Sequence, residues 1–286
     1  MSLLVTVSGI SKHFGAIQEF DGLSLELRPG VTGLLGPNGA GKATLMRCLA
    51  STHAPDSGRV HVLGFDLAHP AERLGARSKL GYLPQDAGLY PHFAVESLAE
   101  YMALLKEIAQ PEARRQEVDR VLEEVDLTGA RKSKIRKLSG GMRQRLGIAL
   151  ALIGDPRFLI LDEPMVGLDP EQRMRIRGTL SRLGEDRIVL LSTHQTEDVA
   201  ALCQRVLVMR RGEIVFDGTP QEVARQATGR VWLAAQPALG GAGTSWRAAD
   251  GRYRTLGAPP PGAEPAEPTV EDGYLALLGV PEEASG

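Results

Sequence analysis

The sequence predicts an α/β fold in which a largely parallel sheet is interrupted by an inserted helical segment. Residues 158–161 and 188–191 are continuous apolar runs, which is typical of strands buried on both faces of a parallel sheet. Strand-like and helix-like segments alternate along the chain, as they do where crossover helices cover such a sheet. Residues from about 89 to 154 have a helical pattern with little sign of strands, so we expect the insertion there.

The N-terminal part of the chain is expected to be rich in strands. Residues 4–7 are β-prone, and Leu23, Leu25 and Leu27 alternate with polar residues, as in a strand with one buried face. Residues 31–35 are a short apolar strand that leads into a glycine-rich loop, and apolar side chains at helical spacing follow that loop.

The C-terminal part contains a hairpin, a proline-rich segment and a short helix. Residues 206–209 and 213–216 flank a short turn and predict a β-hairpin. Residues 258–268 are rich in proline and are expected to form an extended linker. Thr269 with Asp272 three residues later predicts a capping box at the start of a terminal helix.

Composition limits the kinds of partner. The chain has 33 Lys and Arg against 35 Asp and Glu, a formal charge of -2, whereas nucleic-acid-binding domains carry a concentrated basic excess. Only two cysteines are present, and no apolar run approaches the ~20 residues that a membrane-spanning helix needs. The N-terminus lacks the basic and apolar stretches of a signal peptide. We therefore expect a cytoplasmic protein without nucleic acid or membrane span, whose membrane role comes through a partner.

The glycine-rich loop after residues 31–35 is a candidate phosphate site. Its residues are Gly36, Pro37, Asn38, Gly39, Ala40, Gly41 and Lys42. Glycines let backbone N–H groups curl round a phosphate, the following helix adds positive potential at its N-terminus, and the lysine supplies a charge for the β- and γ-phosphates. The alternative is a glycine-rich turn beside a surface lysine. The flanking strand and helix favour the phosphate site.

The residue after the lysine departs from this motif. Ser or Thr at that position offers a hydroxyl to Mg²⁺, but this chain has Ala43. Thr44 lies about 100° further round the helix and cannot take that role, so we expect its hydroxyl at the α-phosphate. The missing hydroxyl predicts weaker Mg²⁺ binding and slower hydrolysis.

Two carboxylates end the buried strand at residues 158–161. Asp162 is placed to hold Mg²⁺, and Glu163 is placed to polarise an attacking water. The alternative is that these are solvated acids at a strand end, and the presence of the phosphate loop in the same chain argues against it. His194 ends the next buried strand, where polar groups of a parallel sheet face the ligand.

A second helix start could also bind an anion. Ser139, Gly140 and Gly141 open a helix with a hydroxyl and exposed N–H groups. They lie too far along the chain to belong to the first loop, which suggests a composite site shared between two copies. An ordinary N-cap is the alternative, and it is favoured when these residues are considered by themselves.

In this order and spacing, the motifs resemble the ATPase subunit of ATP-binding cassette (ABC) transporters over roughly residues 3–225. The resemblance implies a P-loop NTPase core, with Walker A at residues 36–44, Walker B at 158–163 and a D-loop at 166–169. It implies a cassette at residues 1–228, with the helical subdomain inserted at about 89–154, and a C-terminal extension at 229–286. It also assigns single roles: Phe14 stacks on adenine, Gln85 contacts Mg²⁺ and senses the membrane partner, and His194 meets the γ-phosphate.

The same resemblance implies cofactors and partners. ATP and Mg²⁺ are expected, with two subunits joined head to tail so that residues 139–141 of one close over ATP held by the other. Residues 268–277 are similar to the tail of ATPases paired with ABC-2-type permeases, which handle drugs, antibiotics, polysaccharides or cofactors. A helix packing on its own domain explains that tail equally well. The expected place is the inner face of the cell membrane.

Three functions remain open at this stage. The leading one is an ATPase that powers a separate permease, with export indicated by the tail alone, so import stays possible. A soluble ABC ATPase acting on DNA or ribosomes is the second, although such proteins usually carry two cassettes or a long coiled coil. Ala43 motivates the third, a nucleotide-gated binding module with little hydrolysis.

Overall fold

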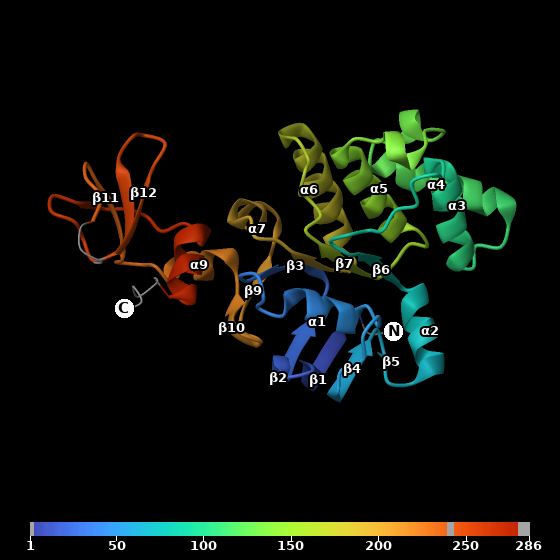
Figure 1. Cartoon of the computed structure of the whole chain (residues 1–286), viewed down its shortest axis with the longest axis horizontal. Helices are drawn as coiled ribbons and strands as arrows, with labels where there is room; N and C mark the ends of the chain where they lie inside the picture. The colour runs from blue at the N-terminus through green and yellow to red at the C-terminus, as the bar shows by residue number, and fades with distance from the viewer. Residues whose placement is uncertain (1–2, 239–242, 280–286) are drawn as a thin grey trace.

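The computed structural model describes residues 3–238 and 243–279, and a six-stranded sheet forms its centre (Figure 1). The strand order is β10-β9-β3-β8-β7-β6, and every neighbouring pair is parallel except the β9–β10 hairpin. The strands are β3 (Gly30–Leu35), β6 (Leu80–Leu83), β7 (Phe158–Asp162), β8 (Ile188–Ser192), β9 (Arg205–Arg210) and β10 (Glu213–Gly218). The predicted parallel sheet and the predicted hairpin are confirmed.

Successive side chains of these strands enter two different cores. Leu159 packs in one core with Ile176 of helix α6 (Pro170–Gly184). Its neighbour Ile160 packs in the other core with Leu45 of helix α1 (Lys42–Leu49). Both faces of the sheet are therefore covered, which explains why β7 and β8 are continuous apolar runs in the sequence.

A second sheet covers the α1 side. It is antiparallel, in the order β2-β1-β4-β5. Its strands are β1 (Val5–Phe14), β2 (Ile17–Leu27), β4 (Ser57–Val62) and β5 (Phe65–Asp66). Buried residues of this sheet share one core with α1, so the strands predicted near the N-terminus hold the loop between β3 and α1 in place.

The segment expected to be helical contains three helices and two short 3₁₀ turns. These are α3 (Val95–Leu105), α4 (Pro111–Glu124), η1 (Thr128–Ala130), η2 (Ile135–Lys137) and α5 (Gly140–Leu152). Helix α2 (Pro70–Ser78) precedes β6, and α7 (Thr196–Leu202) follows β8. Helix α5 packs over β6 and β7, and α3 and α4 lie further out at the β6 end of the sheet, as Figure 1 shows.

The C-terminal part departs from the sequence prediction. Residues 258–268 do not form a continuously extended linker, because the Ala263 N–H donates to the Pro260 carbonyl at 3.1 Å and closes a turn. They also supply β14 (Glu264–Pro265) to a sheet in the order β12-β13-β11-β14. Its other strands, which the sequence analysis missed, are β11 (Val231–Ala234), β12 (Gly243–Arg247) and β13 (Tyr253–Gly257). Helix α9 (Val270–Leu278) lies between this sheet and the rest of the chain (Figure 1), and α8 (Pro220–Arg225) packs against α9 and the β9–β10 hairpin.

A buried ion pair joins the small sheet to α9. The predicted capping box is confirmed, since the Thr269 hydroxyl accepts from the Asp272 N–H while the Asp272 carboxylate accepts from the Thr269 N–H. The same carboxylate accepts from the Arg254 guanidinium on β13. Burial opposes ionisation of Asp272, but the hydrogen bonds from Arg254 and Thr269 prevail and lower its pKa.

Arg254→Met is expected to destabilise the chain by about 3 kcal/mol at neutral pH, because it leaves the fully buried Asp272 carboxylate without its cation. Because the pKa of Asp272 is lower in the folded chain, its ionisation stabilises the fold at pH values above the unfolded-state pKa of about 3.9. This stabilisation is lost as the pH falls through the folded-state pKa. The deficit should therefore shrink below about pH 4. Chemical denaturation at pH 7 and pH 3.5 measures this. Arg252→Met, just before the same strand and with exposed partners, is the matched control and should leave the free energy of unfolding nearly unchanged.

Candidate functional site

The glycine-rich loop runs from the end of β3 into α1 and leaves no room for side chains at its C-terminal end. Gly41 has φ +98°, a left-handed conformation that favours glycine. A Cβ there would lie 2.8 Å from Met209 Cε and 3.1 Å from the Glu19 carbonyl oxygen. The strands β2 and β9 therefore fix the loop at the N-terminus of α1, where free N–H groups and the helix dipole attract an anion.

Lys42 begins α1 and folds back over this loop. Its ammonium donates to the carbonyl oxygens of Gly36 and Pro37, the latter at 3.0 Å. Burial lowers the pKa of Lys42, while the carboxylates of Glu163 and Asp162 oppose that shift. The lysine at the start of α1 and the two acids at the C-terminal end of β7 thus interact electrostatically, as the sequence predicted for one site.

The register between β7 and β8 places a hydroxyl beside the buried acid. Asp162 pairs with Ser192 across the two strands, and the Ser192 hydroxyl donates to the Asp162 carboxylate. The same serine accepts the Glu163 N–H through its hydroxyl and its carbonyl oxygen, both at 3.2 Å. Sequence reasoning did not select Ser192, and only its place at the strand end next to His194 could have indicated it.

Glu163 is held from three directions just beyond β7. Its φ is +51°, an uncommon conformation for a residue other than glycine. Its Oε1 lies 2.9 Å from Nδ1 of His194, so the structure brings these two predicted site residues together. Its carbonyl oxygen accepts from the Gln144 side chain of α5 at 2.9 Å, a contact that no sequence motif indicates.

The residues after Lys42 have different environments. Ala43 is half-buried in the first turn of α1 and offers no hydroxyl. Thr44, which is predicted to meet an α-phosphate, is buried and donates to the Glu19 carboxylate at 3.0 Å. The hydroxyl of Thr44 is therefore engaged by strand β2 in this structure.

Residues 139–141 begin α5 next to the loop after β7. Ser139 is the N-cap, and its hydroxyl accepts from the Met142 N–H at 3.2 Å. Gly140 is exposed, whereas a Cβ on Gly141 would lie 2.8 Å from Gln172 Oε1 and 3.1 Å from the Gly167 carbonyl oxygen. Within residues 3–238 and 243–279, no hydrogen bond joins 139–141 to the loop 36–42 of the same chain.

Phe14 and Gln85 lie apart from these contacts. Phe14 is 43% exposed, with the Lys12 ammonium 5.4 Å from its ring centroid and the His53 ring packed edge-on at 5.9 Å. An exposed aromatic face of this kind can stack on a planar ring. Gln85 is exposed just after β6, and the described chain gives its side chain no hydrogen bond.

The acids and Gln85 fit Mg²⁺ better than a metal held only by protein. No group of three or more His, Cys, Asp or Glu in the described ranges could hold a metal ion. The available donors are oxygens, chiefly the Asp162 carboxylate, and Mg²⁺ is commonly bound by one or two carboxylates together with phosphates and waters. The described helices include none that is both long enough and apolar enough to cross a bilayer.

Comparison with known proteins gives consistent matches. The family described as ABC transporter matches residues 20–166. The chain is 39% identical to the probable multidrug ABC transporter ATP-binding protein YbhF of Escherichia coli K12, over 82% of this chain and 40% of that protein's length. It is 37% identical to the daunorubicin resistance ATP-binding protein DrrA3 of Streptomyces coeruleorubidus, over 79% of this chain and 71% of that protein.

Solved structures agree on the fold. The dimeric, ADP- and Pi-bound ATP-binding cassette MJ0796 superposes with a TM-score of 0.70 at 23% identity, covering 75% of this chain and 98% of the cassette. The cbiO1 structure from Clostridium perfringens, part of the ABC transporter complex cbiONQ, gives a TM-score of 0.69 at 26% identity, over 78% of this chain and 91% of that one. The chain spans 40% of the length of YbhF and 71% of the length of DrrA3.

The paired glycines at the start of α5 give a test of the site's packing. Gly141→Ala should lower the free energy of unfolding by about 1–2 kcal/mol, because the Gly167 backbone must move to admit the methyl group. Gly140→Ala has nothing within 4 Å of the added carbon and should be neutral or slightly stabilising. Thermal unfolding without nucleotide compares the two variants. Equal stabilities would mean that the loop at Gly167 does not pack against α5 as described.

Proposed function

The chain belongs to the ABC transporter family, and on that premise we propose that it binds and hydrolyses ATP to drive a separate membrane permease. The observation that carries the proposal is the convergence of Lys42 with Asp162, Glu163 and His194 at the carboxyl ends of β3, β7 and β8. A lysine on a glycine-rich loop beside a carboxylate–histidine pair is an arrangement suited to phosphoryl transfer to water.

Each residue of that group has a definite task in the proposed reaction. Lys42 leaves its two loop carbonyls and pairs with the β- and γ-phosphates of ATP. Glu163 accepts a proton from the water that attacks the γ-phosphorus, and the β–γ bridging oxygen leaves with ADP. His194 fixes the orientation of the Glu163 carboxylate through Nδ1 and presents the opposite edge of its ring toward the γ-phosphate.

Mg²⁺ would be held by Asp162 and Gln85 together with ATP, and when bound it neutralises charge on the β- and γ-phosphates. The Ser192 hydroxyl keeps the Asp162 carboxylate in place for that role. Ala43 removes the hydroxyl that this position usually offers, so the carboxylate carries more of the binding.

The proposed ATP site includes groups outside the phosphate loop as well as the loop itself. Phe14 supplies an exposed ring for the adenine, and the loop at 36–44 supplies backbone N–H groups for the phosphates. Ser139, Gly140 and Gly141 are assigned to the ATP held by a second copy of the chain, since among the described residues no hydrogen bond joins them to loop 36–42 of their own chain. The proposed working unit is therefore a homodimer of cassettes.

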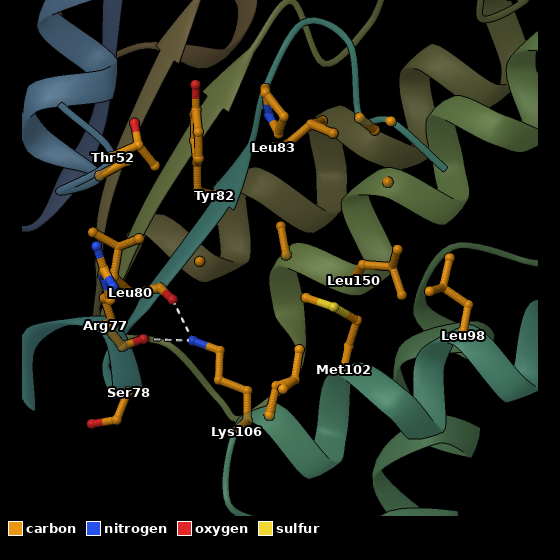
Figure 2. Close-up of a pocket in the computed structure, with 18 of the residues that line it drawn as sticks. Thr52, Arg77, Ser78, Leu80, Tyr82, Leu83, Leu98, Met102, Lys106 and Leu150 are labelled. Carbon is orange, nitrogen blue, oxygen red and sulfur yellow. Dashed lines mark hydrogen bonds between the residues drawn. The ribbon is translucent and has the colours of Figure 1, made fainter. Parts of the chain in front are cut away.

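The permease is proposed to dock in a cavity beside Gln85. This cavity has a volume of about 730 Å³ and lies between β6 with its following segment, α2, α3 and α5 (Figure 2). Leu74, Tyr90 and Leu105 line it with side chains that are 64%, 56% and 59% exposed. Exposed apolar side chains of this size in a cavity wall match an apolar cytoplasmic segment of a membrane protein. Such a partner places the cassette on the inner face of the membrane.

Export of a small molecule is the proposed direction of transport. Relatives of this chain are called daunorubicin resistance and linearmycin resistance ATP-binding proteins, and others are called Nod factor export proteins. These names, with the ABC-2-like tail at residues 268–277, favour an ABC-2-type permease. Ala43 favours one alternative, a nucleotide-gated subunit that hydrolyses ATP slowly.

Glu163→Gln is expected to reduce ATP turnover by about 10²-fold or more, because the amide cannot accept the proton of the attacking water. ATP binding should remain, since the phosphate loop is unchanged. Phosphate release and equilibrium ATP binding measure the two effects. Glu171→Gln makes the same change at an exposed acid on α6 and should leave turnover near that of the wild type. Undiminished turnover in Glu163→Gln would exclude this carboxylate as the base.

Ala43→Ser is expected to tighten Mg²⁺ binding to the ATP complex by about 1–3 kcal/mol, because it restores one oxygen ligand. Turnover should rise with it if the missing hydroxyl limits the wild type. Mg²⁺ titration of ATP binding and of turnover measures both quantities. Ala43→Cys is the matched control, since its thiol has a similar size but is a poor ligand for Mg²⁺. Identical Mg²⁺ affinity in the serine and cysteine variants would show that residue 43 does not face the metal.

A further inference from the structure

Lys106 lies in the wall of the 730 Å³ cavity, and its amine has no carboxylate partner among the described residues. It follows the last residue of α3, and its ammonium donates to the Arg77 carbonyl oxygen at 2.7 Å and the Leu80 carbonyl oxygen at 2.5 Å (Figure 2). Among residues 3–238 and 243–279, no Asp or Glu oxygen lies within 4 Å of its nitrogen. Two other charged residues line the cavity: Arg77 donates to Ser51, and Glu107 forms no ion pair with Lys106.

The two carbonyl oxygens hold Lys106 in place without requiring its charge. An ammonium group has three N–H donors, and two of them are used here. A neutral amine keeps two N–H donors, so it can make the same two bonds and present a lone pair in the third direction. The cavity around it is formed largely by apolar side chains, including Leu98, Met102 and Leu150 in Figure 2.

Burial disfavours the protonated form of this amine, and in the described part of the chain no carboxylate lies within 4 Å to oppose that effect. Removal from water lowers the pKa of Lys106 to about 8. A substantial fraction of the side chain is therefore neutral near pH 7.5, whereas a lysine with the usual value of about 10.4 is almost wholly protonated. Lys42, whose pKa burial also lowers, differs because two carboxylates face it.

We propose that Lys106 is an acylation site, at which the neutral amine reacts with a small activated acyl donor that enters the cavity. The lone pair of Nζ attacks the carbonyl carbon of a thioester, a C–N bond forms, the C–S bond breaks, and the thiolate leaves with the bonding electrons. The nitrogen then loses one proton to water. An acyl phosphate would react in the same way, with a C–O bond breaking and phosphate leaving.

Acylation changes the contacts at this point. The amide nitrogen keeps one N–H, so it can serve only one of the Arg77 and Leu80 carbonyls. The positive charge is lost from the C-terminal end of α2, where a cation is favourable, and the acyl group takes up part of the cavity. An effect on permease docking follows from this and rests on the proposed function, whereas the acylation itself does not.

The experiment treats the purified full chain with S-acetyl-N-acetylcysteamine, a neutral thioester, between pH 7 and pH 10. Peptide mass spectrometry follows acetylation at each lysine, and exposed Lys79 is the internal control. At pH 7.5 we expect Lys106 to react at least about tenfold faster than Lys79, with a midpoint near pH 8. A parallel series with acetyl phosphate shows which donor class the cavity accepts faster.

A pair of variants tests the cause of the reactivity. Met102→Glu places a carboxylate one helical turn before Lys106, which should raise the pKa of the amine and slow its acetylation at least about threefold. Met102→Gln is the uncharged control and should keep the wild-type rate. Reaction of Lys106 at the rate and pH dependence of Lys79, or no reaction with either donor, would overturn the proposal. Since no ATP is involved, a chain that fails to hydrolyse ATP can still pass this test.

Discussion

The parallel register between β7 and β8 is the constraint on which the candidate site depends. It pairs Asp162 with Ser192, so that a buried carboxylate meets a hydroxyl instead of standing alone in a low-dielectric environment. The same serine accepts the Glu163 N–H, and two residues beyond the end of β8 His194 meets the Glu163 carboxylate. A shift of one residue would exchange the two faces of β8 and separate all four groups. The apolar sequences of both strands therefore stabilise the site as well as the core.

The sequence was most informative where a local pattern has one physical solution. Continuous apolar runs identified β7 and β8, because only strands covered on both faces bury every side chain. The capping box at Thr269 was identified because two side chains satisfy each other's backbone across one turn. The strand-end positions of Asp162, Glu163 and His194 followed from the same reasoning, although their roles toward ATP and Mg²⁺ stay predictions.

Contacts between elements that are distant along the chain could not be predicted from local sequence patterns. The small sheet β11–β14 was missed because its strands are short, mix buried and exposed positions, and are separated by glycine and proline. Gln144 has no motif of its own, and its bond to the Glu163 carbonyl depends on how α5 docks against the core. Lys106 likewise looks like a solvated end of a helix until α3 is placed beside β6.

The bond from Gln144 to Glu163 has a consequence for the proposed pair of cassettes. Helix α5 begins with the residues assigned to the ATP of the second subunit. Five residues after Ser139, Gln144 of the same helix donates to the carbonyl oxygen of Glu163, which is assigned to the ATP of its own subunit. The two hydrolysis events are then not independent, because a tilt of α5 would move groups at both ATP sites. In such a pair the rate of ATP hydrolysis would depend sigmoidally on ATP concentration. An inactive site in one subunit would then lower the rate of the dimer by more than half.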